Sequence, residues 1–401
     1  MDKKFITVSA NEENPKWEQI VSRVSPIYVR DGELRTEFGR DYTRIIFSNS
    51  YRRLKHKTQV FFSPEDDHIC TRIEHVNNVE SISYTIASSL GLNTELTKAI
   101  SVAHDLGHSP FGHQGEKILN EISKKDIGET FWHEQNGVYL VDKIELLEDY
   151  EGSKQNLNLT YAVRDGIISH CGEIDEASTK PRQEFIDLYN YTKPNEYAPY
   201  TWEACIVKIA DKISYIGRDI EDAVSLKIID YKQTEELKNL FQNKDVRAVN
   251  NSSIIHELAI DLYRNSSIEN GLMFSEAGLN LINKIKEFNY KNIYFDKSLT
   301  PSLSYFNLVI NEIYNLFKSA YDKENTINNL QKLTYKYGSL IEKFVSWLEN
   351  YIDLGNREEI LKNKVVFNPF DEKSYSKAII TYISGMTDQY AEKAYHSIIS
   401  C

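Results

Sequence analysis

The feature that most constrains the fold of this 401-residue chain is an apolar period of three to four residues. In the segment "TWEACIVKIADKISYIGRDIEDAVSL" (201–226), isoleucines recur at this spacing, at Ile206, Ile209, Ile213, Ile216 and Ile220. Such a stripe covers one face of an α-helix, whereas a strand would alternate every second residue. The segment therefore predicts a long amphipathic helix packed on its isoleucine face.

The same period recurs along most of the chain and predicts an all-α protein. One helix is expected from Arg72 to Gly91, and a second, capped by Asn93 or Thr94, continues toward Gly107. Strand signals are weak, with a short ribbon expected around 26–30 and loops at 153–160 and 178–181. Further helical stretches are expected near 253–265, 276–288, 303–321, 325–353 and 374–398.

These patterns predict a single domain. No convincing linker divides the chain, so we expect one all-α domain over residues 1–401. Its core is expected at about 45–225, followed by a helical C-terminal region at about 226–401.

Composition narrows the classes of function. The net charge of -12 argues against a general nucleic-acid coat, but it leaves room for a local basic pocket. The four cysteines lack zinc-site spacing and are expected to be free thiols in a reducing compartment. No secretory signal and no apolar run of about 18 residues is present, which predicts a cytoplasmic protein without membrane spans. The cysteines are Cys70, Cys171, Cys205 and Cys401.

The chemistry is concentrated in "SVAHDLGHSPFGHQGE" (101–116), which holds three of the ten histidines. His104 and Asp105 are adjacent and point about 100° apart on a helix, so a metal site needs ligands from other helices. His75 and Asp211 lie inside two of the predicted helices. Two imidazoles and two carboxylates suit Mn, Fe, Mg, Ni or Co better than structural zinc. The plain alternatives are a chance His-Asp pair and a solvated Asp211.

Several segments carry a resemblance to a known family. "HDLGHSPFGHQGE" resembles the signature of HD-domain deoxynucleoside triphosphate triphosphohydrolases, the dGTPase family. Four further segments are similar to family blocks: "GRDYTRIIFSNSYRRLKHKTQVF" (39–61), "TRIEHVNNVESI", "LNLTYAVRDGIISH" (157–170) and "YISGMTDQYA" (382–391). The resemblance implies an HD-domain helical bundle with a helical C-terminal extension.

The resemblance also implies a reaction and a set of roles. Water would attack the α-phosphorus of a deoxynucleoside triphosphate and release the deoxynucleoside and tripolyphosphate. The catalytic group expected from it is His113, Glu116, His108 and His133, and the divalent metal ligands are His75, His104, Asp105 and Asp211. His113, held by Glu116, is the candidate general acid, although the same pair could instead act as a general base. His108 and His133 would donate hydrogen bonds near the phosphates.

Substrate recognition follows from the same resemblance. Arg72, one helical turn before His75, and Lys212 match positions that bind phosphate. Tyr215 would crowd out a 2′-hydroxyl, while Asp219 and Gln59 would accept the 3′-hydroxyl, together forming a deoxyribose filter. The plain alternative for the polar stripe on this helix is a solvated face.

The leading hypothesis is thus a metal-dependent dNTP triphosphohydrolase that prefers dGTP. One alternative keeps the HD metal site but acts on a nucleoside monophosphate, a cyclic nucleotide or an alarmone. The other is a non-enzymatic nucleotide- or nucleic-acid-binding scaffold. The resemblance further implies a homo-oligomer, tetramer or hexamer, and a nucleotide or single-stranded DNA effector.

Overall fold

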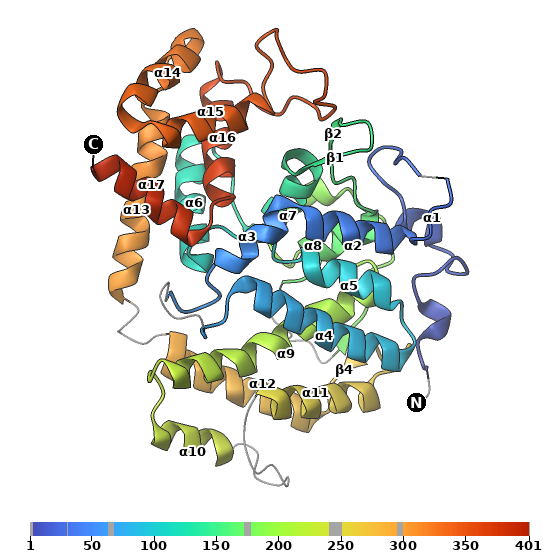
Figure 1. Cartoon of the computed structure of the whole chain (residues 1–401). Coiled ribbons are helices and arrows are strands. Elements are labelled where there is room, and N and C mark those ends of the chain that lie inside the picture. Colours follow the sequence, from blue (N-terminus) through green and yellow to red (C-terminus); the bar gives the residue numbers. More distant parts are fainter. Residues whose placement is uncertain are drawn as a thin grey trace. The chain divides into compact units, whose positions relative to one another are not determined.

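The computed structural model describes residues 3–29, 31–62, 68–171, 178–239, 251–294 and 300–400. Helices dominate these ranges (Figure 1), which confirms the all-α prediction. The helices are α1 (Trp17–Ile20), α2 (Glu37–Phe47), α3 (Asn49–Arg53), α4 (Arg72–Leu90), α5 (Thr94–Ala103), α6 (Gly112–Asp126), α7 (His133–Tyr139), α8 (Tyr161–Ser169), α9 (Trp202–Ser225), α10 (Tyr231–Asn239), α11 (Asn251–Asn265), α12 (Glu276–Asn289), α13 (Thr300–Lys318), α14 (Thr326–Tyr337), α15 (Ser339–Glu349), α16 (Glu372–Ser384) and α17 (Asp388–Ile399).

Within the described residues, two short antiparallel pairs of strands accompany the helices. Strand β1 (Leu146–Glu148) pairs with β2 (Lys154–Asn156), and β3 (Ser178–Thr179) pairs with β4 (Leu272–Met273). The expectation of plain loops at 153–160 and 178–181 is therefore wrong at β2 and β3. Strands of two or three residues are too short to show an alternating pattern. Residues 26–29 form no strand, and the last residue of that predicted ribbon lies outside the described residues.

Contacts divide the chain into two compact units. The first comprises residues 1–45, 65–104 and 159–300, and the second comprises 46–64, 105–158 and 301–401. The boundary between them includes the peptide bond that joins His104 to Asp105.

In the first unit, α9 packs against α4, α5, α8, α11 and α12 (Figure 1). The predicted helix ends are realised by local chemistry. Gly91 follows α4 with φ 85°, a left-handed conformation that glycine adopts without a Cβ clash. The Asn93 side chain accepts the backbone N–H groups of Glu95 and Leu96 and so caps α5. His104 directly follows the last residue of α5.

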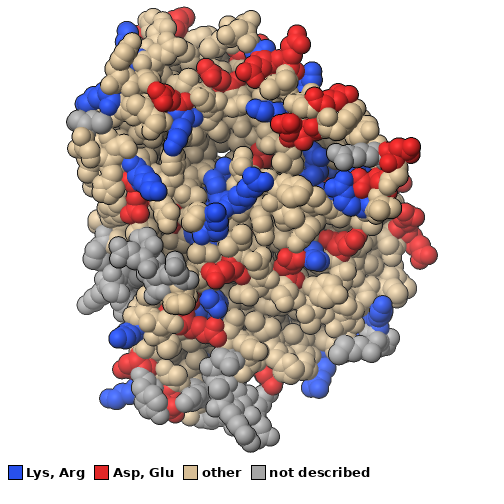
Figure 2. All heavy atoms as spheres, in the orientation of Figure 1, with Lys and Arg blue, Asp and Glu red and all other residues tan. Residues whose placement is uncertain are grey.

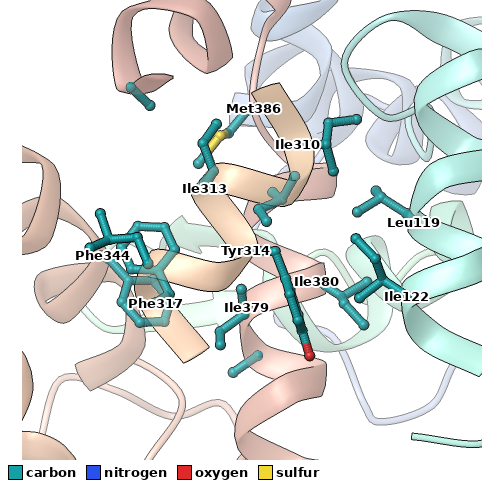
Figure 3. Close-up of a cluster of buried hydrophobic side chains, with 14 of the residues drawn as sticks. Leu119, Ile122, Ile310, Ile313, Tyr314, Phe317, Phe344, Ile379, Ile380 and Met386 are labelled. Carbon is teal, nitrogen blue, oxygen red and sulfur yellow. The ribbon is translucent and has the colours of Figure 1, made fainter. Parts of the chain in front are cut away.

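The second unit has its own apolar core, built mainly by α6, α13, α15 and α16. Figure 3 shows side chains of α13 among those of the other helices, with Ile380 of α16 beside Ile122 of α6 and Phe317 of α13 beside Phe344 of α15. Phe317 and Phe344, both fully buried, face each other with ring centroids 4.3 Å apart. Burial of this kind stabilises a fold by roughly 25 cal/mol for each Å² of apolar surface.

Two long helical patterns of the C-terminal region are interrupted. The stretch near 325–353 is divided at Gly338, which has φ 48° and separates α14 from α15. The stretch near 374–398 is divided by a turn between Ser384 and Asp388 that separates α16 from α17. Apolar spacing alone did not reveal either break.

The surface carries charges of both signs. On the face shown in Figure 2, Asp and Glu side chains are interspersed with Lys and Arg side chains. Cys70 and Cys205 are buried free thiols and Cys171 is partly buried, while Cys401 lies outside the described residues. Within the described ranges, every helix is too short or too polar to cross a membrane.

Candidate active site

Three of the predicted metal ligands meet in the first unit. His75 of α4, His104 after α5 and Asp211 of α9 each place one ligand atom within 4.8 Å of the others. Asp211 Oδ1 lies 2.9 Å from His75 Nε2 and 3.8 Å from His104 Nε2. Two imidazole nitrogens and a carboxylate oxygen at such distances fit a divalent cation of the mixed N/O class. The donor set thus suits the expected metal, while the ligand role stays a prediction.

The orientation of His104 also suits a ligand. Its Nδ1 lies 2.6 Å from the backbone carbonyl of Ser101, an oxygen that only accepts hydrogen bonds. Nδ1 must therefore carry the proton, which leaves the lone pair on Nε2, the atom that faces Asp211. A backbone carbonyl that fixes the tautomer in this way is a common support for a metal-binding histidine.

The charge state of Asp211 follows from its neighbours. Burial by itself would raise the pKa of the carboxyl, but the hydrogen bond and charge of His75 and the charges of His104 and His170 lower the pKa overall. Asp211 is therefore a carboxylate over the whole neutral range, which is the form that binds cations.

A second group of polar side chains lies in the second unit. His108, His113, Glu116 and His133 each place one ligand-type atom within 4.8 Å of the others. Asp105, the residue after His104, lies in the same unit with its carboxylate 3.0 Å from His108 Nε2. The four predicted catalytic residues are thus close together.

Glu116 contacts His133 more closely than His113. Its Oε2 lies 2.8 Å from His133 Nδ1 but 3.7 Å from His113 Nδ1, and the His113 side chain is 71% exposed. His133 is buried, and its ring stacks on that of His108 with centroids 3.8 Å apart. Glu116 is therefore shared by an exposed and a buried imidazole, whereas the sequence predicted a partnership with His113 alone.

Burial and neighbouring charges shift the pKa values of both His133 and Glu116. Burial would lower the pKa of His133, but the carboxylates of Glu134 and Glu116 raise it to about 9. Burial would raise the pKa of Glu116, but the charge of His133 and the hydrogen bonds of His113 and His133 bring it well below its usual range. At neutral pH the pair is therefore an imidazolium and a carboxylate.

Two glycines permit close backbone approaches in the loop that carries His108 and at the start of α6, which carries His113. A Cβ on Gly107 would lie 1.9 Å from the carbonyl oxygen of His133, and one on Gly115 would lie 1.9 Å from that of Pro110. Only glycine permits such close backbone approaches. Phe111 has φ 61° and ψ 25° and immediately precedes α6, so the loop enters this helix through a strained residue.

The residues of the predicted deoxyribose filter are half or fully buried. Asp219 is buried on α9, so this part of the polar stripe is not a solvated face. Its Oδ2 accepts the Tyr294 hydroxyl at 2.5 Å, and burial raises its pKa to about 7. Among the described residues, neither Asp219 Oδ1 nor Gln59 Oε1 has a hydrogen-bond partner, although both atoms are buried. Unsatisfied buried acceptors of this kind suit a ligand hydroxyl.

The predicted phosphate-binding cations are buried as well. Arg72 is the first residue of α4, one turn before His75, and is 2% exposed. Lys212 follows Asp211 on α9 and is 4% exposed, and Tyr215 lies one turn further along the same helix. Buried cations of this kind are costly unless they meet a negative partner.

Three residues that contact the predicted site residues were not predicted from the sequence. His170, after α8, is buried with its ring 4.9 Å from that of His104. Tyr294 holds Asp219, and Glu134 helps to raise the pKa of His133. His170 closes the segment 157–170 that resembles a family block, so its signal was present, whereas Tyr294 is one of 26 tyrosines and had none.

Comparison with known proteins agrees with this geometry. The sequence profile of the HD-domain family matches residues 72–216, so the chain is an HD-domain protein. This range holds both the His75–His104–Asp211 group and the group around Glu116. Relatives named deoxyguanosinetriphosphate triphosphohydrolase-like protein match almost throughout. Those of Rickettsia bellii and Rickettsia prowazekii are 32% and 33% identical, over 91% of this chain and 92% of their own length. The chain belongs to this deoxyguanosinetriphosphate triphosphohydrolase-like family of HD-domain hydrolases.

Proposed function

We propose that the chain hydrolyses deoxynucleoside triphosphates, with dGTP preferred, to deoxynucleoside and tripolyphosphate. The observation that carries the proposal is the meeting of His75, His104 and Asp211 from three segments far apart in the sequence. It is supported by relatives named deoxyguanosinetriphosphate triphosphohydrolase-like protein, which match 91% of the chain.

In this proposal His75, His104 and Asp211, with Asp105 as the next residue after His104, hold a divalent cation such as Mn, Mg, Fe, Ni or Co. Such a cation, when bound, neutralises phosphate charge and lowers the pKa of water. Arg72 and Lys212 add positive charge for the phosphates, Arg72 as a fork for two oxygens and Lys212 as a point charge.

The leaving 5′-oxygen needs a proton as its bond to the α-phosphorus breaks. We assign this proton transfer to His113, whose Nδ1 lies 3.7 Å from Glu116 and whose ring is exposed enough to meet a substrate. The buried His133 imidazolium and His108 donate hydrogen bonds to phosphate oxygens. If the His113–Glu116 pair acts instead as a general base, it removes a proton from the attacking water.

Selection of deoxyribose rests on Tyr215, Asp219 and Gln59. Asp219 Oδ1 in the first unit and Gln59 Oε1 in the second are buried acceptors that have no hydrogen-bond partner among the described residues, and each suits a substrate hydroxyl. A buried acceptor left without its hydroxyl loses roughly 1–3 kcal/mol. Tyr215 fills the space that a 2′-hydroxyl would need.

The deciding experiment is to incubate the protein with each dNTP and with GTP, in Mg or Mn, and to identify the phosphate product. Tripolyphosphate supports the proposal. Orthophosphate or pyrophosphate points to an HD-domain phosphohydrolase acting on another nucleotide, and nucleotide binding without any product points to a scaffold.

Two variants separate metal binding from proton transfer. His104→Ala is expected to lose both bound metal and hydrolysis, because it removes a ligand. His113→Ala is expected to keep the metal and to lose turnover by about 100-fold or more. Metal content by mass spectrometry and steady-state rates test both variants, and near-full activity of His113→Ala would remove His113 as proton donor.

The remaining expectations belong to the same proposal. A tetramer or hexamer is expected and is measured by light scattering on the purified protein. A nucleotide or single-stranded DNA effector is tested by adding each to the dGTP assay below saturation. Fractionation of cells tests the expected cytoplasmic location.

A further inference from the structure

Asp388, the first residue of α17, is a buried carboxylate that accepts hydrogen bonds from two distant segments of the second unit. Its Oδ2 accepts the backbone N–H of Thr58 at 2.9 Å and also the Thr58 hydroxyl. Its Oδ1 accepts the backbone N–H of Phe111 at 2.9 Å. Asp388 is 4% exposed, so these three donors face its two oxygens with little competition from water.

Both partners of Asp388 are neighbours of candidate site residues. Thr58 directly precedes Gln59, a predicted acceptor of the 3′-hydroxyl. Phe111 lies two residues before His113, in the loop that also carries His108. The Asp388 carboxylate therefore holds the backbone next to Gln59, the proposed sugar contact, and the backbone close to His113, the proposed proton donor.

The Phe111 backbone needs such support. Its φ of 61° is a left-handed value that a residue with a bulky side chain rarely adopts. The ring is held by Phe306, with parallel planes and centroids 4.3 Å apart, and the backbone N–H is held by Asp388. Since α6 begins at the next residue, the Phe111 conformation sets the direction in which this helix starts.

The turn that ends in Asp388 makes further contacts of the same kind. The buried ammonium of Lys57 donates to the backbone carbonyls of His108 and Ser384. The Asn136 side chain donates to the carbonyl of Gly107 at 2.7 Å and to the Ser384 hydroxyl at 3.3 Å. The residues Ser384 to Asp388 thus form a common anchor for segments 57–58 and 107–111.

We infer that Asp388 is a positioning residue, which orients Gln59 and the His108–His113 loop through Thr58 and Phe111 without touching substrate. This inference rests on the proposed function for the roles of Gln59 and the histidines. The turn between α16 and α17 then positions site residues in addition to joining two helices.

The test compares Asp388→Asn with Asp371→Asn. An amide keeps one acceptor oxygen but turns an NH2 group toward a donor, so Asp388→Asn cannot hold both segments. Asp371 is the exposed N-cap of α16, where its side chain accepts Ser374 N–H at 2.8 Å, and asparagine caps a helix equally well. The control therefore makes the same chemical change in the same part of the chain.

We expect Asp388→Asn to fold, to bind Mn²⁺ as the wild type does, and to exchange the amide hydrogens of Thr58 and Phe111 faster. Its kcat for dGTP is expected to fall about 10- to 100-fold, the loss that accompanies one charged hydrogen bond. Asp371→Asn is expected to match the wild type in exchange and in kcat.

Two results would overturn the inference. Unchanged exchange at Thr58 and Phe111 would show that Asp388 does not hold these segments, whatever the activity. Faster exchange with a lowered melting temperature but a wild-type kcat per folded molecule would show a purely structural role. A wild-type protein inactive on all dNTPs would refute the proposed function instead. The exchange measurement would still show whether Asp388 holds the Thr58 and Phe111 segments.

Discussion

Replacement of Asp219 by asparagine is expected to stabilise the metal-free protein at alkaline pH and to change its stability little in acid. Burial raises the pKa of Asp219 to about 7, from an ordinary 3.8. A carboxyl whose pKa is higher in the folded state than in the unfolded one favours folding when both states are protonated. That contribution is complete below about pH 4 and is lost as pH rises through about 7.

The size of the effect follows from the two pKa values. A difference of about three pH units, at ~1.4 kcal/mol each, gives up to about 4 kcal/mol. Asparagine stays neutral and retains an oxygen for the Tyr294 hydroxyl, so the variant avoids this loss. The stability advantage of Asp219→Asn should therefore grow from near zero in acid toward about 4 kcal/mol at about pH 8.

The assay is urea unfolding of EDTA-treated protein, followed by circular dichroism, from about pH 5 to about pH 8. Asp31→Asn, at an exposed position, controls for the loss of one negative charge. An advantage that is the same at every pH, or that appears equally in the control, would show that Asp219 is not destabilised by burial as a carboxylate. If Asp219 also accepts the 3′-hydroxyl, the stabilised variant will bind dGTP less well.

Three further changes test other parts of the structure. Glu116→Gln removes a carboxylate that raises the pKa of His133, so this pKa should fall below its value of about 9, as measured by NMR titration of the imidazole. Gly107→Ala should cost about 3 kcal/mol in urea unfolding because its Cβ would meet backbone atoms, whereas Gly385→Ala, with no atom nearer than 3.5 Å, should cost far less. Tyr215→Ala should raise hydrolysis of GTP relative to dGTP, and an unchanged ratio would remove Tyr215 from the sugar filter.

Much of the helical architecture could be predicted because local signals and tertiary structure agree. The apolar period of 201–226 specifies α9, and Gly91 and Asn93 mark the ends of α4 and α5 by their own backbone and side-chain chemistry. The break at Gly338 was not predicted because the apolar spacing continues across it. Its left-handed backbone is a property of one residue that periodicity does not register.

The site was predictable in its donors and less so in their partners. His75, His104 and Asp211 were singled out because histidine and aspartate are the residue types that hold a cation, and the structure brings them together. The closer contact of Glu116 with His133 joins α6 to the first residue of α7, a tertiary contact that spacing along the chain does not reveal. Tyr294 comes from a distant segment, and only tertiary structure places it on Asp219.

The two glycine contacts have a consequence for reading related sequences. Gly107 packs against the carbonyl of His133, and Gly115 packs against that of Pro110. Each glycine is therefore required at its own position in the chain. Inserting or deleting a single amino acid between them would shift one out of register. We therefore expect homologues to keep the same number of residues from His104 to Glu116, and to vary in length at surface turns such as 149–152.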